Sequence, residues 1–209
     1  SWLRGVSALP NSFAHESYID ELAAAAGVDP VQYRLQWLND PRARELVQAT
    51  AEKAGWKPRT QAQHQPSQGD WLQGQGFAYA RYVHSKWPGF GAAWAAWVID
   101  IDVDPASGRI AVRRLVVGQD TGMMVNPDGV RHQIHGNVIQ VLSRTLKERV
   151  RFADGKVASR EWASYPILKF PDVPVLDVEL MGSPEDKPLG AGEAASAPVP
   201  AAIGNAVFD

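Results

Sequence analysis

The sequence WVIDIDVDPASGRIAV, residues 97–112, is the stretch that decides the fold. Apolar and acidic side chains alternate along its first half, and this period of two is typical of a β-strand with one buried and one exposed face. The predicted buried face carries Trp97, Ile99, Ile101 and Val103, and the exposed face carries Asp100, Asp102 and Asp104. The DPASG segment has turn chemistry, and apolar alternation resumes at Arg109. The stretch therefore predicts a β-hairpin with strands at 91–104 and 109–118.

A further alternating stretch at 74–87 extends the predicted hairpin to a three-stranded meander. The first quarter of the chain instead has helical signals: a cap at Asn11 or Ser12 with a stop at Gly27, and two Asp-Pro starts. The first predicted helix runs from this cap to Gly27. The second starts at Asp29-Pro30, and its predicted buried side carries Tyr33, Leu35, Trp37 and Leu38. The third runs from Asp40-Pro41 to Gly55.

The second half of the chain mixes helix and strand signals. We expect a Gly/Asn/Pro loop over 120–128, then a helix whose apolar positions repeat from Ile134 and which reaches about Val150. A turn at Asp154-Gly155, extended segments over 162–181 and an Ala-rich helix over 194–207 follow. This order predicts an α+β fold rather than a doubly wound sheet. The predicted organisation is a helical segment at 1–59, a polar linker at 60–73 and an α+β portion at 74–209.

Composition excludes several classes of function. The chain has 209 residues, of which 45% are hydrophobic and 21% charged, as in ordinary globular proteins. Its 21 basic and 23 acidic side chains give a net charge of -2, so nucleic acid is not an expected partner. Zero cysteines exclude disulfides, thiolate metal sites and iron–sulfur ligation within the chain. No apolar run long enough to span a bilayer and no export signal are present, and cytoplasmic and periplasmic locations both stay open.

Several isolated motifs do not support a function. The glycines of Gly74-Gln75-Gly76 open a strand rather than a helix, so they do not form a dinucleotide-binding fingerprint. His132 and His135 lack a third ligand at a telling spacing, and no Gly-x-Ser-x-Gly elbow of a serine hydrolase occurs. The three aspartates could bind calcium, but a solvated face with cross-strand ion pairs to Arg109, Arg113 or Arg114 is the favoured interpretation.

The segment Gly190-Ala191-Gly192-Glu193 contains the best candidate for chemistry. Glycines let a backbone approach another body closely, because they lack Cβ and allow positive φ. Glu193 would then lie beside whatever the loop contacts. Taken alone, the segment also fits a plain junction in which an acidic residue complements the dipole of the following helix.

The order of motifs along the chain is more specific than any one of them. The motifs follow one another in this order: Arg4-Gly5, the segment 13–23, Asp29-Pro30, Asp120-Thr121-Gly122, Asn126-Pro127, Gln133-Ile134-His135-Gly136, Tyr165-Pro166 and Gly190-Ala191-Gly192-Glu193. This series resembles the molybdenum-binding large subunit of the xanthine oxidase family, within which isoquinoline 1-oxidoreductase and nicotinate dehydrogenase, together with membrane-linked aldehyde dehydrogenases, are most similar. The resemblance covers essentially the whole chain but only the C-terminal part of that subunit, which fits the abrupt start at Ser1-Trp2.

The resemblance implies a molybdenum hydroxylase that oxidises an N-heteroaromatic or aldehyde substrate, with water as the oxygen source. Glu193 would be the base that activates a metal-bound hydroxide, while Arg4, Gly5, Gly190, Ala191 and Gly192 would lie against the molybdopterin-type cofactor. Expected partners are the N-terminal portion of the same subunit, an iron–sulfur subunit and a cytochrome c acceptor, with membrane association through partner subunits. We expect the 209-residue piece to lack the cofactor and activity by itself.

The sequence departs from the family pattern at three places: Val6-Ser7, His135 where glutamate is usual, and Ala194 where proline usually follows the glutamate. Two other hypotheses remain open at this point. The chain could be a non-catalytic scaffold that docks to another subunit, or Glu193 could work with Asp120 or Asp172 as a two-carboxylate hydrolase.

Overall fold

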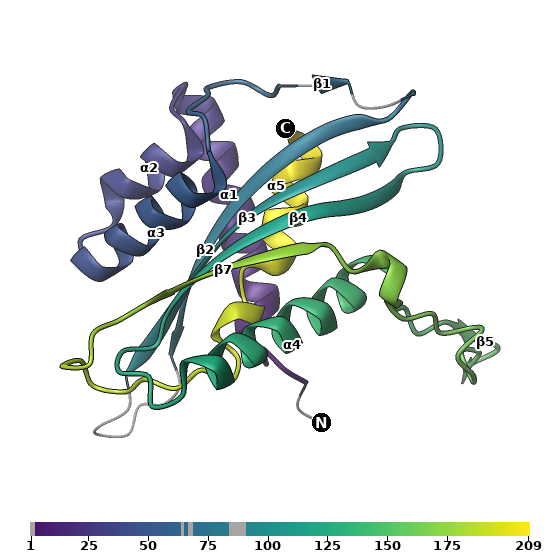
Figure 1. Cartoon of the computed structure of the whole chain (residues 1–209). Helices are drawn as coiled ribbons and strands as arrows, with labels where there is room; N and C mark the ends of the chain where they lie inside the picture. Colours follow the sequence, from purple (N-terminus) through teal and green to yellow (C-terminus); the bar gives the residue numbers. More distant parts are fainter. Residues whose placement is uncertain (1–2, 64, 67–68, 84–90) are drawn as a thin grey trace.

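A five-stranded sheet forms the centre of the protein (Figure 1). The computed structural model describes residues 3–63, 65–66, 69–83 and 91–209. The strands lie in the order β1 (Gln65–Pro66), β2 (Leu72–Val83), β3 (Ala92–Asp104), β4 (Arg109–Asp120) and β7 (Val175–Met181). The first four pair antiparallel, which confirms the predicted meander, and β7 pairs parallel to β4. The part of the predicted strand beyond Val83, at 84–87, lies outside the described residues.

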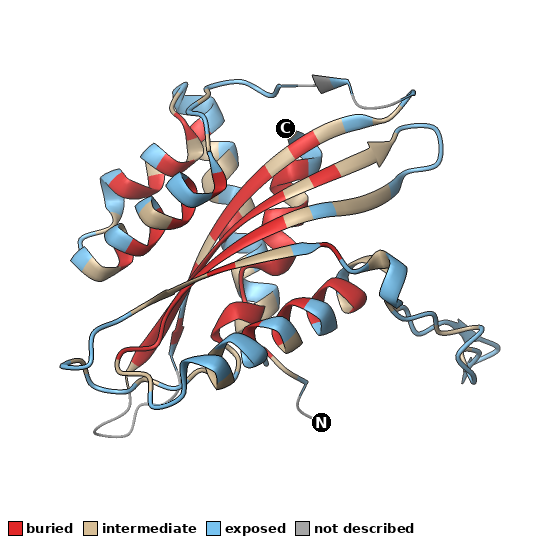
Figure 2. Cartoon of the chain, viewed as in Figure 1, coloured by how far each residue is buried: buried red, intermediate tan, exposed pale blue. Residues whose placement is uncertain are grey.

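Helices cover both faces of the sheet (Figures 1 and 2). Because the strands are mostly antiparallel, the predicted α+β class is confirmed. On one face α3 (Pro41–Ala54) packs on β3 and β4 through Leu46, Val47, Val98 and Val116. On the other face lie α4 (Pro127–Leu146) and α5 (Val199–Phe208), and α1 (Ala8–Ala26) packs against α5. In the described part of the chain, no helix is both long and apolar enough to cross a membrane.

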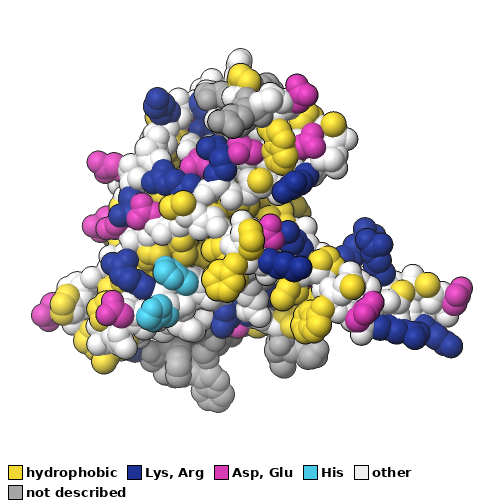
Figure 3. All heavy atoms as spheres, turned by 45° about the vertical axis from the view of Figure 1, so that its right-hand side comes forward, with side chains coloured by type: hydrophobic (Ala, Val, Ile, Leu, Met, Phe, Trp, Pro, Cys, Tyr) yellow, Lys and Arg dark blue, Asp and Glu magenta, His cyan; other side chains and the backbone are white. Residues whose placement is uncertain are grey.

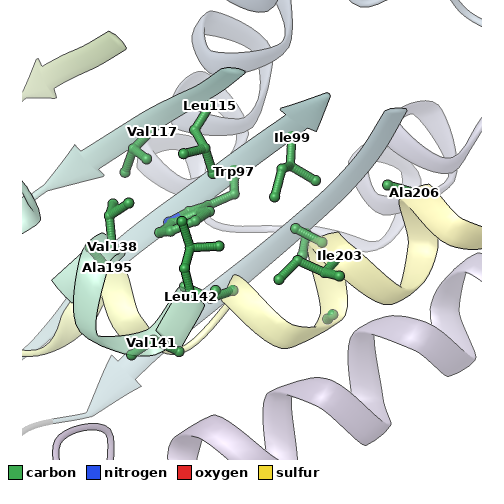
Figure 4. Close-up of a cluster of buried hydrophobic side chains, with 14 of the residues drawn as sticks. Trp97, Ile99, Leu115, Val117, Val138, Val141, Leu142, Ala195, Ile203 and Ala206 are labelled. Carbon is green, nitrogen blue, oxygen red and sulfur yellow. The ribbon is translucent and has the colours of Figure 1, made fainter. Parts of the chain in front are cut away.

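The predicted buried face of β3 forms the main core. Trp97, Ile99 and Ile101 are fully buried there in one cluster with side chains of α4 and α5. Figure 4 shows Trp97 and Ile99 in this cluster. On the opposite face Asp102 pairs with Arg113 at 3.0 Å, and Asp100 lies 4.0 Å from Arg114. The expectation of cross-strand ion pairs is therefore confirmed.

The helix starts follow local capping chemistry. The Asp29 side chain accepts hydrogen bonds from the backbone amides of Val31 and Gln32, and Asp40 caps α3 in the same way. Gly27 and Gly55 end α1 and α3 in the left-handed conformation, as predicted. Two expectations were wrong. The first helix starts at Ala8 rather than at Asn11 or Ser12, and Trp37, at the end of α2 (Pro30–Trp37), is 70% exposed rather than buried.

The second half of the chain differs from the sequence prediction at helix ends. Helix α4 starts at Pro127, inside the loop predicted over 120–128, because Asn126 caps it by accepting from the amide of Gly129. It ends at Leu146. The predicted helix over 194–207 is a 3-10 turn, η2 (Ala194–Ser196), followed by α5, since prolines stand at 198 and 200.

The predicted linker at 60–73 is not free of strand structure, because it contains β1 and the first two residues of β2. The division of the chain into 1–59, 60–73 and 74–209 otherwise stays a prediction. Near Asp154-Gly155 the short strands β5 (Phe152–Ala153) and β6 (Lys156–Val157) form a hairpin that projects from the body (Figure 1). A 3-10 turn, η1 (Phe170–Asp172), leads back to β7.

The glycines of β2 have a packing role. A Cβ on Gly74 would lie 1.9 Å from the carbonyl oxygen of Ala206, and one on Gly76 would lie 2.1 Å from that of Ala202. Glycine at these two positions lets α5 lie directly on the strand. This close contact accounts for the Gly-x-Gly pattern that superficially matches a nucleotide-binding loop.

Candidate functional site

Glu193 stands where the loop after β7 enters η2. It is half-buried, and its own carbonyl oxygen accepts hydrogen bonds from the Ser196 amide at 2.9 Å and the Ser196 hydroxyl at 2.6 Å. These bonds fix the backbone of Glu193. Since η2 is a single 3-10 turn, the interpretation of Glu193 as the dipole-complementing first residue of an α-helix is wrong.

The carboxylate of Glu193 contacts two distant segments. The backbone amide of Gly5 donates to Oε1 at 3.4 Å, and the hydroxyl of Tyr82 donates to Oε2. Gly5 has φ of +89° and lies against Ser196, because a Cβ there would be 3.0 Å from the Ser196 hydroxyl oxygen. The structure therefore brings together two of the predicted site segments, Arg4-Gly5 and Gly190–Glu193, at opposite ends of the chain.

Helix α4 lies behind this loop. The fully buried Asn137 side chain donates from Nδ2 to the carbonyl oxygen of Gly192 at 3.1 Å, and Gln133 Nε2 reaches the same oxygen at 3.4 Å. The Gln133–Gly136 motif thus meets the Gly-Ala-Gly-Glu motif through a backbone carbonyl. Two donors on one carbonyl orient the peptide unit that precedes Glu193.

Arg4 lies against the same helix. A Cβ built on Gly136 would lie 3.4 Å from Arg4 Nη1, an ordinary van der Waals distance, so the guanidinium lies directly beside the helix at Gly136. The Arg144 side chain donates from Nη1 to the carbonyl oxygen of Arg4 at 2.6 Å. The Arg4-Gly5 turn is therefore fixed between α4 and η2.

The Asp120-Thr121-Gly122 motif anchors the approach to the loop. The Asp120 carboxylate takes two hydrogen bonds from Arg42 and one from the Gly122 amide at 2.9 Å. The carbonyl of Thr121 accepts from the amide of Leu189 at 2.8 Å, directly before Gly190. A Cβ on Gly122, where φ is +68°, would lie 2.0 Å from the carbonyl oxygen of Lys187. This motif therefore supports the position of the loop from the end of β4.

The outer side of the loop is open. Gly192 is exposed, and a Cβ built on it would meet no atom within 4 Å. Gly190 has φ of +84°, a conformation that strongly favours glycine. An open glycine next to a half-buried carboxylate leaves space for a ligand to lie against backbone.

The other proposed carboxylates have different partners. Asp120 is held by Arg42, as described above, and Asp172 pairs with Lys147 at 2.8 Å. Carboxylates that are committed to ion pairs are poor partners for a second catalytic carboxylate. The geometry therefore speaks against a two-carboxylate hydrolase.

The two α4 histidines lie together on the surface, where Figure 3 shows histidine side chains side by side. Their ring centroids are 6.3 Å apart. Burial, with the neighbouring His132 and Arg131, lowers the pKa of His135. In the described part of the chain, no group of three or more histidine or acidic side chains could hold a metal ion.

Sequence reasoning missed Tyr82 and Asn137. Tyr82 stands in an ordinary alternating strand, and nothing in its neighbourhood distinguishes it from other strand aromatics. Asn137 directly follows Gly136, so its adjacency to a motif was a signal that could have been used. Both residues reach the site only through the tertiary fold.

Known proteins with a similar sequence support one family. Residues 39–174 match the molybdopterin cofactor-binding domain. The chain is 64% identical over 209 residues to a nicotinate dehydrogenase subunit of Pseudomonas putida, covering 100% of this chain and 18% of that protein. It is 31% identical over 206 residues to the beta subunit of isoquinoline 1-oxidoreductase of Brevundimonas diminuta, covering 98% of this chain and 24% of that protein.

A solved structure agrees at the level of the fold. The aldehyde oxidoreductase from Desulfovibrio desulfuricans superimposes with a TM-score of 0.79 at 14% identity, covering 99% of this chain and 39% of that one. The chain thus spans only a fraction of the length of each of these relatives. These matches confirm the family that the sequence motifs indicated, which fits the xanthine oxidase family. The chain belongs to the molybdopterin cofactor-binding domain family.

Proposed function

We propose that this chain is the C-terminal part of the large subunit of a molybdenum hydroxylase of the nicotinate dehydrogenase and isoquinoline 1-oxidoreductase type. The complete enzyme would oxidise an N-heteroaromatic or aldehyde substrate with water as the oxygen source. The names of the two similar proteins support the heteroaromatic class in particular. The identity of 64% to the nicotinate dehydrogenase subunit, against 31% to the isoquinoline 1-oxidoreductase subunit, favours the nicotinate dehydrogenase type.

Within this proposal Glu193 is the base. The observation that carries it is the placement of one half-buried carboxylate, oriented through both oxygens by Gly5 and Tyr82, beside the open backbone of Gly192. A carboxylate in such a position accepts a proton at Oε1 or Oε2 while its own backbone stays fixed. Catalysis benefits because little reorganisation is then needed when the proton moves.

The residues around Glu193 fit the family cofactor. The open space at Gly192 and the positive φ of Gly190 let a large flat group approach the backbone, and Ala191 between them is small. Arg4 and Gly5 would bound the same space and offer a cation and a backbone amide. When bound, the molybdenum cofactor supplies the two-electron redox chemistry, and the protein supplies orientation and the proton acceptor.

Other parts of the enzyme would complete the site. Because the chain spans 18% of the similar nicotinate dehydrogenase protein, most of the cofactor contacts would come from the N-terminal portion of the same subunit. An iron–sulfur subunit and a cytochrome c acceptor would take the electrons. Such a cytochrome partner would also bring the enzyme to a membrane.

The test is Glu193→Gln in the complete enzyme, measured as the rate of the reductive half-reaction. The amide keeps the size of the side chain but cannot accept the proton in the same way. We expect a loss of several orders of magnitude with molybdenum still bound. A near-normal rate with full molybdenum content would remove Glu193 from catalysis.

A scaffold function has one observation in its favour. The hairpin region that projects from the body exposes large aromatic side chains, with Phe152 at 72%, Trp162 at 75% and Phe170 at 96% exposure. Hydrophobic and basic side chains lie together on this projection (Figure 3). If the piece is mainly a docking element, light scattering should show self-association that disappears when the N-terminal portion is added.

A further inference from the structure

Tyr82 belongs to a small cluster of alanine side chains between the sheet and η2, and its hydroxyl contacts Glu193. The tyrosine is 8% exposed and packs among Ala80, Ala93, Ala194 and Ala197, which join the ends of β2 and β3 to η2. Because these neighbours are small, η2 lies close to the sheet. A side chain as long as tyrosine can therefore place its hydroxyl on the carboxylate of Glu193.

The chemistry of the contact favours a permanent donor. Burial, and then the hydrogen bond to Glu193, raise the pKa of the Tyr82 phenol well above its ordinary value. The phenol therefore stays neutral and can donate its proton to Glu193 Oε2. With the Gly5 amide on Oε1, each carboxylate oxygen has one donor, and the side chain is restrained in rotation.

We propose that Tyr82 is a positioning residue for Glu193, whose hydroxyl holds the carboxylate in the orientation from which it accepts a proton. This inference rests on the proposed role of Glu193 as the base. It adds a function for the end of β2, which no sequence motif marks. Tyr82 acts through Glu193 and needs no contact of its own with substrate.

The same strand offers a matched control. Tyr79 lies three residues before Tyr82 and belongs to the opposite face of the sheet, where it packs with the α3 side of the core. Replacing either tyrosine by phenylalanine removes one hydroxyl from β2 and keeps the ring. Only the change at Tyr82 removes a donor from Glu193.

The experiment uses the complete holoenzyme and four variants: Tyr82→Phe, Tyr79→Phe, Glu193→Gln and the double variant Tyr82→Phe with Glu193→Gln. Rates are expressed per bound molybdenum, so that loss of folded or loaded protein is not counted as loss of catalysis. Both kcat and KM are measured, together with the single-turnover rate of reduction.

We expect Tyr82→Phe to lower kcat by about 10- to 100-fold, the effect of one hydrogen bond to a charged group, with KM changed less than about twofold. Tyr79→Phe should stay within about twofold of the parent. In the Glu193→Gln background the loss of the Tyr82 hydroxyl should change the single-turnover rate by less than about threefold, because the two residues act as a unit.

Two results would overturn the inference while the proposed base survives. One is a kcat for Tyr82→Phe equal to that of Tyr79→Phe. The other is an equal loss from Tyr82→Phe in both backgrounds, which indicates a general structural role. If Glu193→Gln itself retains near-normal rates, the proposed function fails first, and the positioning role of Tyr82 fails with it.

Discussion

The buried side chain of Asn137 donates a hydrogen bond to the carbonyl oxygen of Gly192 over 3.1 Å, which ties the middle of α4 to the residue before Glu193. The helix motif and the loop motif of this chain are therefore parts of one hydrogen-bonded unit. A change at Asn137 should affect the position of Glu193 without touching its side chain.

Asn137→Ala should reduce turnover of the complete enzyme by about tenfold and destabilise the chain by about 1–2 kcal/mol, since the buried amide no longer donates to the carbonyl oxygens of Gly192 and Gln133. The exposed Gln140, one turn along the same helix, provides the control Gln140→Ala. Urea denaturation and steady-state kinetics check the two effects. Equal behaviour of the two variants would contradict a role for the Asn137 contact.

Gly122→Ala should destabilise the chain by about 2–4 kcal/mol, from the left-handed backbone and from the clash with the Lys187 carbonyl. Gly108 has a similar φ of +70° but no atom within 4 Å of a built Cβ, so Gly108→Ala should cost only about 1 kcal/mol. Comparing the denaturation midpoints of the two variants separates the cost of the left-handed backbone, which both share, from the cost of the steric clash, which only Gly122→Ala has. Similar losses for both glycines would show that the loop moves away from Gly122 freely.

Glu16→Gln should destabilise the chain by about 3–5 kcal/mol, because it removes one of the two carboxylates that pair with the buried Arg34 guanidinium, the other being Asp20 at 2.6 Å. Glu16 is 2% exposed and accepts from Arg34 Nε at 2.8 Å. The exposed Glu21 on the same helix gives the control Glu21→Gln, for which a change below about 0.5 kcal/mol is expected. A comparable effect of the two substitutions, measured by denaturation, would exclude a special role for the buried pair.

Asp20 should make stability depend on pH. Burial raises the pKa of Asp20 to about 6, although Arg34 opposes this shift. The unfolded chain releases this proton near pH 4 and the folded chain only near pH 6, so the folded state binds more protons in between. The contribution of Asp20 to stability therefore falls as pH rises from about 4 to about 6 and is constant above.

The Asp20→Asn variant cannot titrate at this position, so its stability relative to the parent should increase over the same pH range. Denaturation at several pH values from 4 to 7 measures this difference, with the exposed Asp70→Asn as control. A relative stability that stays flat, or that decreases, would show that the Asp20 carboxyl ionises in the folded state as readily as in the unfolded one.

The isolated 209-residue chain should fold at least in part but hold no molybdenum cofactor, since it supplies only one side of the expected binding surface. Metal analysis of the purified chain checks this. Stoichiometric molybdenum in the isolated chain would contradict the prediction and show that the loops at Arg4 and Gly190–Gly192 suffice for binding.

Local chemistry made much of the fold predictable. The Asp-Pro starts at residues 29 and 40 and the glycine stops at 27 and 55 act within one helical turn, so no distant contact is needed to recognise them. The start of α4 was missed although Asn126-Pro127 has the same chemistry, because residues 120–128 were interpreted as a loop. The exposed Trp37 shows that periodicity alone does not decide which apolar side chains find a partner.

The candidate site was predictable only where the order of motifs indicated it. Arg4-Gly5, Gln133–Gly136 and Gly190–Glu193 do lie together, although their catalytic and cofactor roles stay predictions. The contacts from Tyr82 and Asn137 depend on how β2 and α4 pack against the loop. Strand alternation gives the face of Tyr82, but it does not give the segment that meets this face.

The hydrogen bonds that hold Glu193 and its neighbour Gly192 join residues 188, 111 and 55 positions apart in the chain. Contacts of such long range form late, because the loops that they close cost entropy before any packing compensates. During refolding, the helices and the meander can therefore form while Glu193 and Gly192 still lack these three hydrogen bonds. In the complete enzyme, activity should therefore recover later than secondary structure. The delay would correspond to the formation of these long-range hydrogen bonds.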